Sequence, residues 1–143
     1  MFTFITMKSL RIIFIFIIMH SFNMAAQDLS NYTWKNRIVI LYENDTNTAD
    51  VKSALQIIDN NTSKFTERDI LVFVYKDNVF YSVNRKATDI KKSDILPKTN
   101  DGYILIGKDG GIKSKALYPF NLEQLFNLID SMPMRKSEMR YNK

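Results

Sequence analysis

Two continuous apolar runs with a helical stripe between them constrain the fold of this 143-residue chain more than any other feature. The runs are "RIVILY" at Arg37–Tyr42 and "DILVFVY" at Asp69–Tyr75. Continuous runs of strand-forming residues are typical of strands buried on both faces, as in parallel sheets. In "TADVKSALQIID", between the runs, apolar residues recur on one helical face: Val51, Ala54, Leu55 and Ile58. A strand, a helix capped by Asn47 or Thr48, and a second strand predict a right-handed parallel crossover.

The second half of the chain predicts a hairpin followed by a helix. "YILIG" at Tyr103–Gly107 has the composition of a strand, and the Asp109-Gly110 pair after it is a strong turn signal. "IKSKAL" at Ile112–Leu117 alternates in the way expected of a half-exposed edge strand. Asn121 predicts a helix cap, with Gln124 at the capping-box position. The helix that follows has one apolar stripe: Leu122, Leu125, Phe126, Ile129 and Met132.

The middle of the chain is less regular. "VFYSV" at Val79–Val83 predicts a short strand, and the charged segment "ATDIKKSDILP" predicts one short helix that ends before Pro97. The resulting order is β-α-β, a variable middle, and then β-β-α, which is the core order of the thioredoxin fold. The fold class is therefore expected to be α/β and thioredoxin-like, with a small βαβ sandwich of another topology as the rival.

The first 26 residues have the pattern of a secretory signal peptide. Lys8 and Arg11 precede an apolar run at Ile12–Met19, and Ala25-Ala26 supplies the small residues of a cleavage site. The apolar run is shorter than the roughly 20 residues that span a bilayer. We expect residues 1–26 to be a signal peptide and residues 27–143 to be a single secreted or periplasmic domain, without a membrane span after cleavage. An uncleaved N-terminal anchor is the alternative.

Composition excludes several chemistries. The chain has no cysteine, and its single histidine, His20, lies in the predicted signal peptide. The expected domain therefore has no thiol nucleophile, no histidine base and no Cys/His zinc site. Removal of residues 1–26 would lower the formal net charge from +5 to +3, because Lys8 and Arg11 are lost. A charge this small is that of an ordinary solvated surface, so no nucleic-acid partner is predicted.

The position of the usual thioredoxin chemistry contains no sulfur. Redox enzymes of this fold carry a reactive cysteine just after the first core strand, at a helix N-terminus that lowers its pKa. Here that place reads "YENDTNTAD", and the junction before the third core strand, where a cis-proline is usual, reads "TNDGY". The oxygen-rich stretch lacks the glycine and glutamate of an EF-hand loop, and "GKDGG" lacks P-loop spacing. No catalytic residue, cofactor or metal site is predicted.

The stretch "IDSMPMRKSEM" near the C-terminus combines a structural signal with a functional one. Pro133 is expected to kink or stop the helix, with Ile129 and Met132 buried beside it. Arg135 and Lys136 would then offset the partial negative charge of the helix C-terminus, an effect of about 0.3–1 kcal/mol. The alternative is an anion or partner site, in which tertiary structure brings together four cations: Arg37, Arg68, Lys108 and Arg135.

Four segments together resemble the domain of unknown function 4174. They are "YTWKNRIVILY" before Glu43, "ERD" at Glu67–Asp69, "LIGKDGGIK" at Leu105–Lys113 and "IDSMPMRKSE" at Ile129–Glu138. That domain occurs as small exported bacterial proteins and within animal extracellular proteins, namely sushi-repeat-containing proteins and a coiled-coil-domain-containing matrix protein. The resemblance implies a thioredoxin- or peroxiredoxin-like fold and implies no catalytic residues.

Three functional hypotheses remain open at this stage. The first is an exported, non-redox domain that binds an unknown macromolecule or an envelope surface, and that is not an enzyme. The second is an enzyme or carrier that acts on a small anionic ligand through the Arg/Lys set. The third is a degenerate peroxiredoxin that is kept for its shape.

Overall fold

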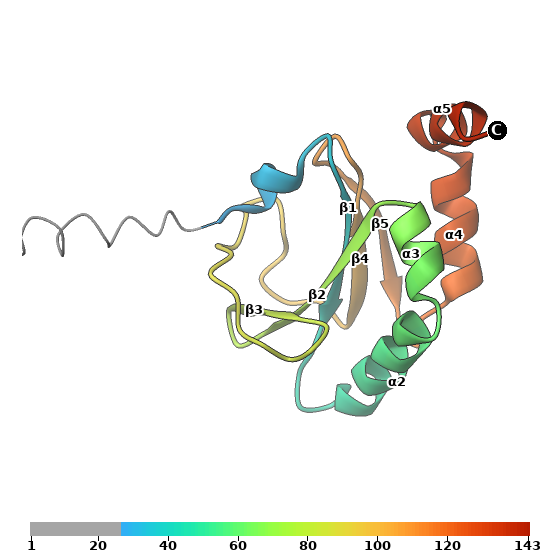
Figure 1. Ribbon diagram of the computed structural model, residues 1–143. Helices are drawn as coiled ribbons and strands as arrows, with labels where there is room; N and C mark the ends of the chain where they lie inside the picture. The colour runs from blue at the N-terminus through green and yellow to red at the C-terminus, as the bar shows by residue number, and fades with distance from the viewer. Residues whose placement is uncertain (1–26) are drawn as a thin grey trace, which may run out of the picture.

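The computed structural model describes residues 27–143 and consists of one mixed sheet with helices packed on one face (Figure 1). The predicted signal peptide, residues 1–26, lies outside the described residues. The sheet has the strand order β3-β2-β1-β4-β5. The strands are β1 (Arg37–Tyr42), β2 (Ile70–Lys76), β3 (Val79–Ser82), β4 (Gly102–Ile106) and β5 (Ile112–Leu117). The helical elements are η1 (Leu29–Tyr32), α2 (Thr48–Asp59), α3 (Thr62–Glu67), α4 (Leu122–Ser131) and α5 (Pro133–Tyr141).

The predicted parallel crossover is confirmed. Strands β1 and β2 pair in parallel, with Arg37 opposite Ile70 and Tyr42 opposite Tyr75, and α2 connects them. Strand β4 runs antiparallel to β1 on its other side, and β4 and β5 form the predicted hairpin. Gly110, in the turn of this hairpin, has a φ of +84°, which suits a residue without a side chain. The order β-α-β followed by β-β-α is therefore the one that the sequence predicts.

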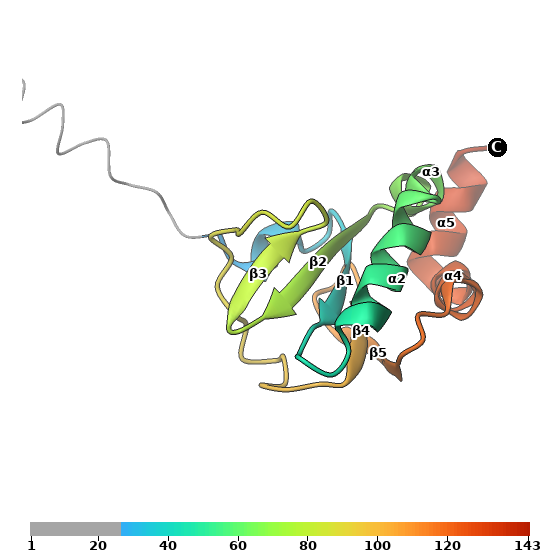
Figure 2. The same ribbon diagram turned by 90° about the horizontal axis from the view of Figure 1, so that it is seen from below.

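All six residues of β1 are buried, because both faces of the central strands are covered. Helices α2, α3 and α4 lie together on one face (Figures 1 and 2). There Val39 and Leu41 of β1 pack in one core cluster with Val51, Ala54 and Ile129. The continuous apolar character of "RIVILY" is thus explained by a sheet with a separate core on each side.

The opposite face is covered by irregular chain. Here Ile38 and Ile40 of β1 share a second core cluster with Leu29 of η1 and with Ile90 and Leu96 from the segment after β3. The predicted short helix in this segment is wrong. Residues 87–97 instead form a loop with two isolated bridges, Tyr81 to Ala87 and Asp28 to Lys91. Burial of Ile90 and Leu96 against the sheet outweighs local helix propensity, because intrinsic propensities are small and tertiary contacts override them.

Proline 133 ends one helix and begins another. Helix α4 stops at Ser131, Met132 is extended with φ −70° and ψ 141°, and Pro133 is the first residue of α5. The predicted stop is confirmed, but the chain turns into a second helix because proline is favoured at a first helical position. Met132 is only half-buried, and Arg135 and Lys136 lie in the new helix instead of the last turn of α4.

Two caps can be compared with their predictions. Asn121 caps α4, since its side chain accepts a hydrogen bond from the backbone N–H of Gln124. Asn47 occupies the position before α2 but makes no side-chain cap there.

Among residues 27–143, no helix is long and apolar enough to cross a bilayer.

Candidate functional site

The C-terminal end of β1 is the place where redox enzymes of this fold carry their nucleophile, and here it holds a buried glutamate. Glu43 follows β1 directly, and its backbone N–H donates to the carbonyl of Tyr75 at 2.9 Å. Its side chain is only 2% exposed and pairs with Lys76 Nζ at 3.5 Å and with Arg85. Both cations come from the β2–β3 hairpin and the turn after it. A buried carboxylate is tolerated in this position because it has two counter-ions.

The loop after Glu43 uses its polar groups internally. The Asn47 side chain donates to the carbonyl of Tyr42 at 3.1 Å and accepts from the N–H of Asn44 at 2.9 Å. These bonds are the reason that Asn47 does not cap α2. Burial, together with the nearby Tyr75, raises the pKa of Tyr42 to about 12. The Tyr42 phenol therefore stays protonated at neutral pH, and it donates to the carbonyl of Pro97 at 3.1 Å.

The opposite end of β1 contains what we call the ion-pair cluster. It consists of the four predicted cations and four carboxylates, namely Arg37, Arg68, Lys108 and Arg135 with Glu67, Asp69, Asp130 and Glu138. These side chains come from the start of β1, the end of α3 and the residues after it, the β4–β5 turn, α4 and α5. The structure therefore brings all four predicted cations together, and each of them faces at least one carboxylate.

Arg37, the first residue of β1, has only 1% of its surface exposed, as does Arg135. Its two terminal nitrogens donate to the carboxylate of Glu138 at 3.2 and 3.3 Å, and Nη1 also donates to the carbonyl of Arg68 at 2.9 Å. This forked geometry is the strong form of an arginine–carboxylate pair. The remaining nitrogen, Nε, is buried and has no hydrogen-bond partner among the described residues.

Arg68 and Arg135 share one carboxylate. Asp130, in the last turn of α4, accepts from Arg68 at 3.0 and 2.8 Å and from Arg135 Nε at 3.2 Å. Arg135 also donates to the side-chain carboxylate of Glu67 at 2.8 Å and to the backbone carbonyl of Glu67 at 3.1 Å. Desolvation raises the pKa of Asp130, but the hydrogen bonds and charges of the two arginines outweigh it, so that the pKa is lowered overall. Arg68 also stacks over the ring of Phe126 at 4.2 Å.

Lys108 links the β4–β5 turn to the rest of the cluster. Its Nζ lies 2.8 Å from Asp69 Oδ2 and 2.6 Å from Glu138 Oε1. Asp69 has a φ of +51°, a conformation that aspartate tolerates better than most residues. Its carbonyl accepts from the N–H of Arg37 at 2.9 Å. The pKa of Glu138, which desolvation tends to raise, is lowered overall by hydrogen bonds and charge from Lys108 and Arg37.

The carboxylates of this cluster are the residues that sequence reasoning missed. Their signal was nevertheless present, because each of the four segments that carry the family resemblance contributes to the cluster. "YTWKNRIVILY" supplies Arg37, "ERD" supplies Glu67 to Asp69, and "LIGKDGGIK" supplies Lys108. "IDSMPMRKSE" supplies Asp130, Arg135 and Glu138. Weak motifs far apart in sequence thus meet at one place in the fold.

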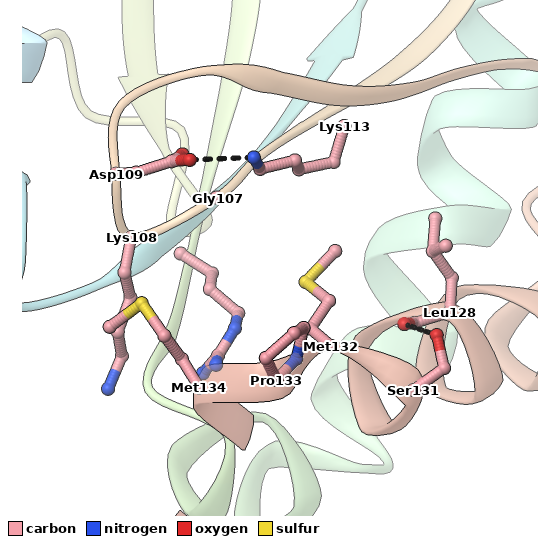
Figure 3. Close-up of a pocket in the computed structure, with 10 residues that line it drawn as sticks. Gly107, Lys108, Asp109, Lys113, Leu128, Ser131, Met132, Pro133 and Met134 are labelled. Atoms are coloured by element: carbon pink, nitrogen blue, oxygen red, sulfur yellow. Dashed lines mark hydrogen bonds and ion pairs between the residues drawn. The ribbon is translucent and has the colours of Figure 1, made fainter. Parts of the chain in front are cut away.

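A cavity of about 530 Å³ adjoins the ion-pair cluster. One part of its lining comes from β1, the β4–β5 turn and the start of β5: Arg37, Gly107, Lys108, Asp109 and Lys113. Its other lining comes from α4 and the start of α5: Leu128, Ser131, Met132, Pro133 and Met134. Figure 3 shows the Asp109–Lys113 ion pair across the cavity from the methionines on either side of Pro133. The opening stretch of α5 therefore forms one wall of a concave surface.

Among residues 27–143, no group of three or more histidine, cysteine, aspartate or glutamate side chains is arranged to hold a metal ion.

The comparisons with known proteins agree with the architecture. The model of the family described as "Domain of unknown function (DUF4174)" matches residues 28–138. No curated protein matches the chain.

Solved structures similar to this one include two peroxiredoxins. The mitochondrial 2-Cys peroxiredoxin of Plasmodium falciparum superposes with a TM-score of 0.52 at 15% identity, covering 76% of this chain and 82% of that one. The reduced 2-Cys peroxiredoxin of Plasmodium vivax gives a TM-score of 0.51 at 12% identity, covering 76% of this chain and 72% of that one. These likenesses confirm the predicted thioredoxin- or peroxiredoxin-like fold, which here has no cysteine.

Proposed function

The chain belongs to the DUF4174 family, and from this premise we propose that it is an exported binding module that performs no thiol redox chemistry. One contrast within the structure carries the proposal. The end of β1 that holds the nucleophile in redox enzymes is occupied by Glu43, whose charge is neutralised by Lys76 and Arg85. The other end has a cavity of about 530 Å³ that Arg37 lines. Recognition is therefore assigned to the end with the ion-pair cluster.

The non-redox part of the proposal rests on the absence of cysteine. Thiol peroxidases and disulfide reductases attack through a thiolate, and methionine oxidation does not turn over without a separate reductase. Purified protein should consume hydrogen peroxide no faster than a matched preparation from cells that lack it, with a cysteine peroxidase as the positive control. Catalytic peroxide consumption that follows the protein through purification would refute this part.

Export is supported by the charged, apolar and small-residue order of residues 1–26. We expect N-terminal sequencing of the protein from the envelope or the medium to begin near Gln27. Intact Met1 or Met7 on protein recovered from the cytosol would contradict export.

The binding part can be tested at a single position. Met134 is 41% exposed at the mouth of the cavity. A photo-reactive residue at position 134 should crosslink a partner in an envelope extract, whereas the same residue at exposed position 52, on α2, should not. Equal crosslinking from both positions, or crosslinking from position 52 alone, would place recognition elsewhere.

The second candidate is an enzyme or carrier for a small anionic ligand that uses Arg37, Arg68, Lys108 and Arg135. The convergence of these four cations favours it. The four carboxylates of the cluster weigh against a highly charged ligand, because they already neutralise the cations. Of the four, Arg37 alone has a buried donor without a partner among the described residues.

A further inference from the structure

We propose that the cavity beside Arg37 binds a monoanion attached to an apolar body, such as a carboxylate on an aliphatic chain. The inference deepens the proposed function and rests on it, because it names the ligand chemistry of the same binding surface. Three features of the cavity support it: a buried donor, an uncapped helix start and an apolar wall.

The buried donor is Nε of Arg37. The side chain is 1% exposed, and its other two nitrogens are committed to Glu138 and to the carbonyl of Arg68. A buried N–H that lacks an acceptor is unfavourable, and native structures rarely leave one without a reason. Arg37 is one of the residues that line the cavity, and we infer that an anionic oxygen bound there accepts this hydrogen bond.

The helix start is that of α5. No side chain caps this nine-residue helix, and Pro133 at its first position has no N–H of its own. The following N–H groups and the helix dipole favour negative charge at this end. Met132, Pro133 and Met134, which form the helix start, all line the cavity. The helix therefore adds a second preference for an anion to that of Arg37.

The apolar wall consists of Leu128, Met132, Pro133 and Met134. Methionine side chains are flexible and adapt to apolar ligands of different shapes. Figure 3 shows Met132, Pro133 and Met134 grouped on one side, opposite the hairpin turn with Asp109 and Lys113. A ligand that carried only charge would leave this wall without a contact.

The charges of the residues around the cavity favour a ligand with a single negative charge. Three cations line the cavity, Arg37, Lys108 and Lys113, with one carboxylate, Asp109. Glu138 and Asp69 pair with Lys108 from behind, so that the six groups are neutral together. A phosphate dianion would have to compete with three carboxylates. A carboxylate needs only the free donor of Arg37 and the start of α5, and its chain would cover the methionines.

Octanoate is a suitable probe, used below its micelle concentration and measured by calorimetry and by NMR of backbone amides. Protein purified after expression of the full chain should bind octanoate, with shifts at Arg37, Lys113 and residues 132–135. Octan-1-ol, octylamine and inorganic phosphate should each bind at least about tenfold more weakly. Octanol or phosphate binding as tightly as octanoate, or no binding of octanoate, would overturn the proposal.

A pair of matched variants tests the position. Met134→Glu adds one negative charge at the cavity mouth and suits a first helical turn, so the fold should be kept. Ser137→Glu adds the same charge to exposed surface of α5 outside the cavity lining. Octanoate affinity should fall at least about tenfold in Met134→Glu and less than about twofold in Ser137→Glu. Equal losses in both variants would overturn the site.

The donor itself is tested by Arg37→Lys, which keeps the charge and removes Nε. If its amide spectrum remains folded, octanoate binding should be lost while the Glu138 pair persists. Unchanged octanoate affinity in this variant would refute the role of Arg37. If the variant does not fold, the octanoate affinity of Met134→Glu tests the site in its place. Failure of octanoate with intact crosslinking from position 134 would overturn this inference alone, whereas loss of both would overturn the proposed function as well.

Discussion

Strand β1 carries a buried charge at each of its ends, and the two charges are balanced in different ways. Glu43, after the last residue, pairs with Lys76 and Arg85, whose side chains are 33% and 41% exposed. Arg37, the first residue, pairs with Glu138, which is 23% exposed and lies 101 positions away in sequence. Glu43 meets cations that lie 33 and 42 positions away in sequence, whereas Arg37 ties the N-terminal half of the domain to its last helix.

This difference indicates what each end is built to do. Both oxygens of Glu43 meet a cation, so the carboxylate at the usual redox position is already paired. At the other end, Arg37 lines a cavity, and its Nε has no hydrogen-bond partner among residues 27–143. This contrast is the reason that we propose recognition at the Arg37 end.

The largest effect is expected for Arg37→Ala. Removal of one partner from a buried ion pair typically costs about 3–5 kcal/mol, a large share of the stability of a small domain. Urea unfolding followed by circular dichroism would measure it, with exposed Lys115→Ala as the control. Because the single variant could unfold outright, the double variant Arg37→Met/Glu138→Leu should recover most of the loss. A loss below about 1 kcal/mol would show that β1 is not anchored through Arg37.

A smaller effect is expected for Glu43→Gln. The change leaves Lys76 and Arg85 without a counter-ion, but both reach water, so we expect a cost of about 1–3 kcal/mol. The same urea experiment provides the comparison with Arg37→Ala. If Glu43→Gln proved the more destabilising of the two, the contrast between the ends of β1 would be reversed.

A pH dependence of stability is expected from two carboxylates of the ion-pair cluster. The pKa values of Glu138 and Asp130 are lowered from ordinary values of 4.5 and 3.8. Their contribution to stability is therefore present above about pH 4.5 and is lost as pH falls through the lowered values. Unfolding midpoints between pH 6 and pH 3 should fall less steeply in Glu138→Gln than in the parent. The exposed Asp59→Asn should follow the parent, and identical slopes for Glu138→Gln and Asp59→Asn would contradict the assignment.

The smallest effect on stability is expected at the rim of the cavity. Lys113 and Asp109 form an i,i+4 pair at 2.7 Å in which both side chains are more than a third exposed. Such surface pairs contribute about 0–1 kcal/mol. Lys113→Gln should therefore change the urea midpoint little, while octanoate affinity should fall. Strong destabilisation of the Lys113→Gln variant would mean that the rim of the cavity stabilises the fold in the same way as the ion-pair cluster.

Local patterns predicted most of the regular structure. The bounds of β1 and α2 follow from apolar periodicity, which depends only on residues close in sequence. The same holds for the Asp109-Gly110 turn and the Asn121 cap. The segment 87–97 was wrongly predicted to be a helix, because burial against a distant sheet face shapes it. Neither helix α3 nor helix α5 was predicted. Helix α3, "TSKFTE", has a single buried residue, Phe65, so its sequence shows no helical periodicity of apolar residues.

The candidate site could be predicted only in part. The sequence identified Arg37, Arg68, Lys108 and Arg135 as a set, and it identified Pro133 as the end of a helix. It could not show that Arg135 is as buried as Arg37. Burial depends on α5, which folds back so that Arg135 reaches Glu67 and Asp130.

By itself, the sequence determined that this domain contains a parallel crossover and has no sulfur nucleophile. Those properties are set by composition and by contacts within a few residues. Only the tertiary structure decided which carboxylate each cation meets and which donor stays free. Charge–charge pairing depends on distances of a few ångströms between segments up to 101 residues apart, and no periodicity along the chain encodes those distances.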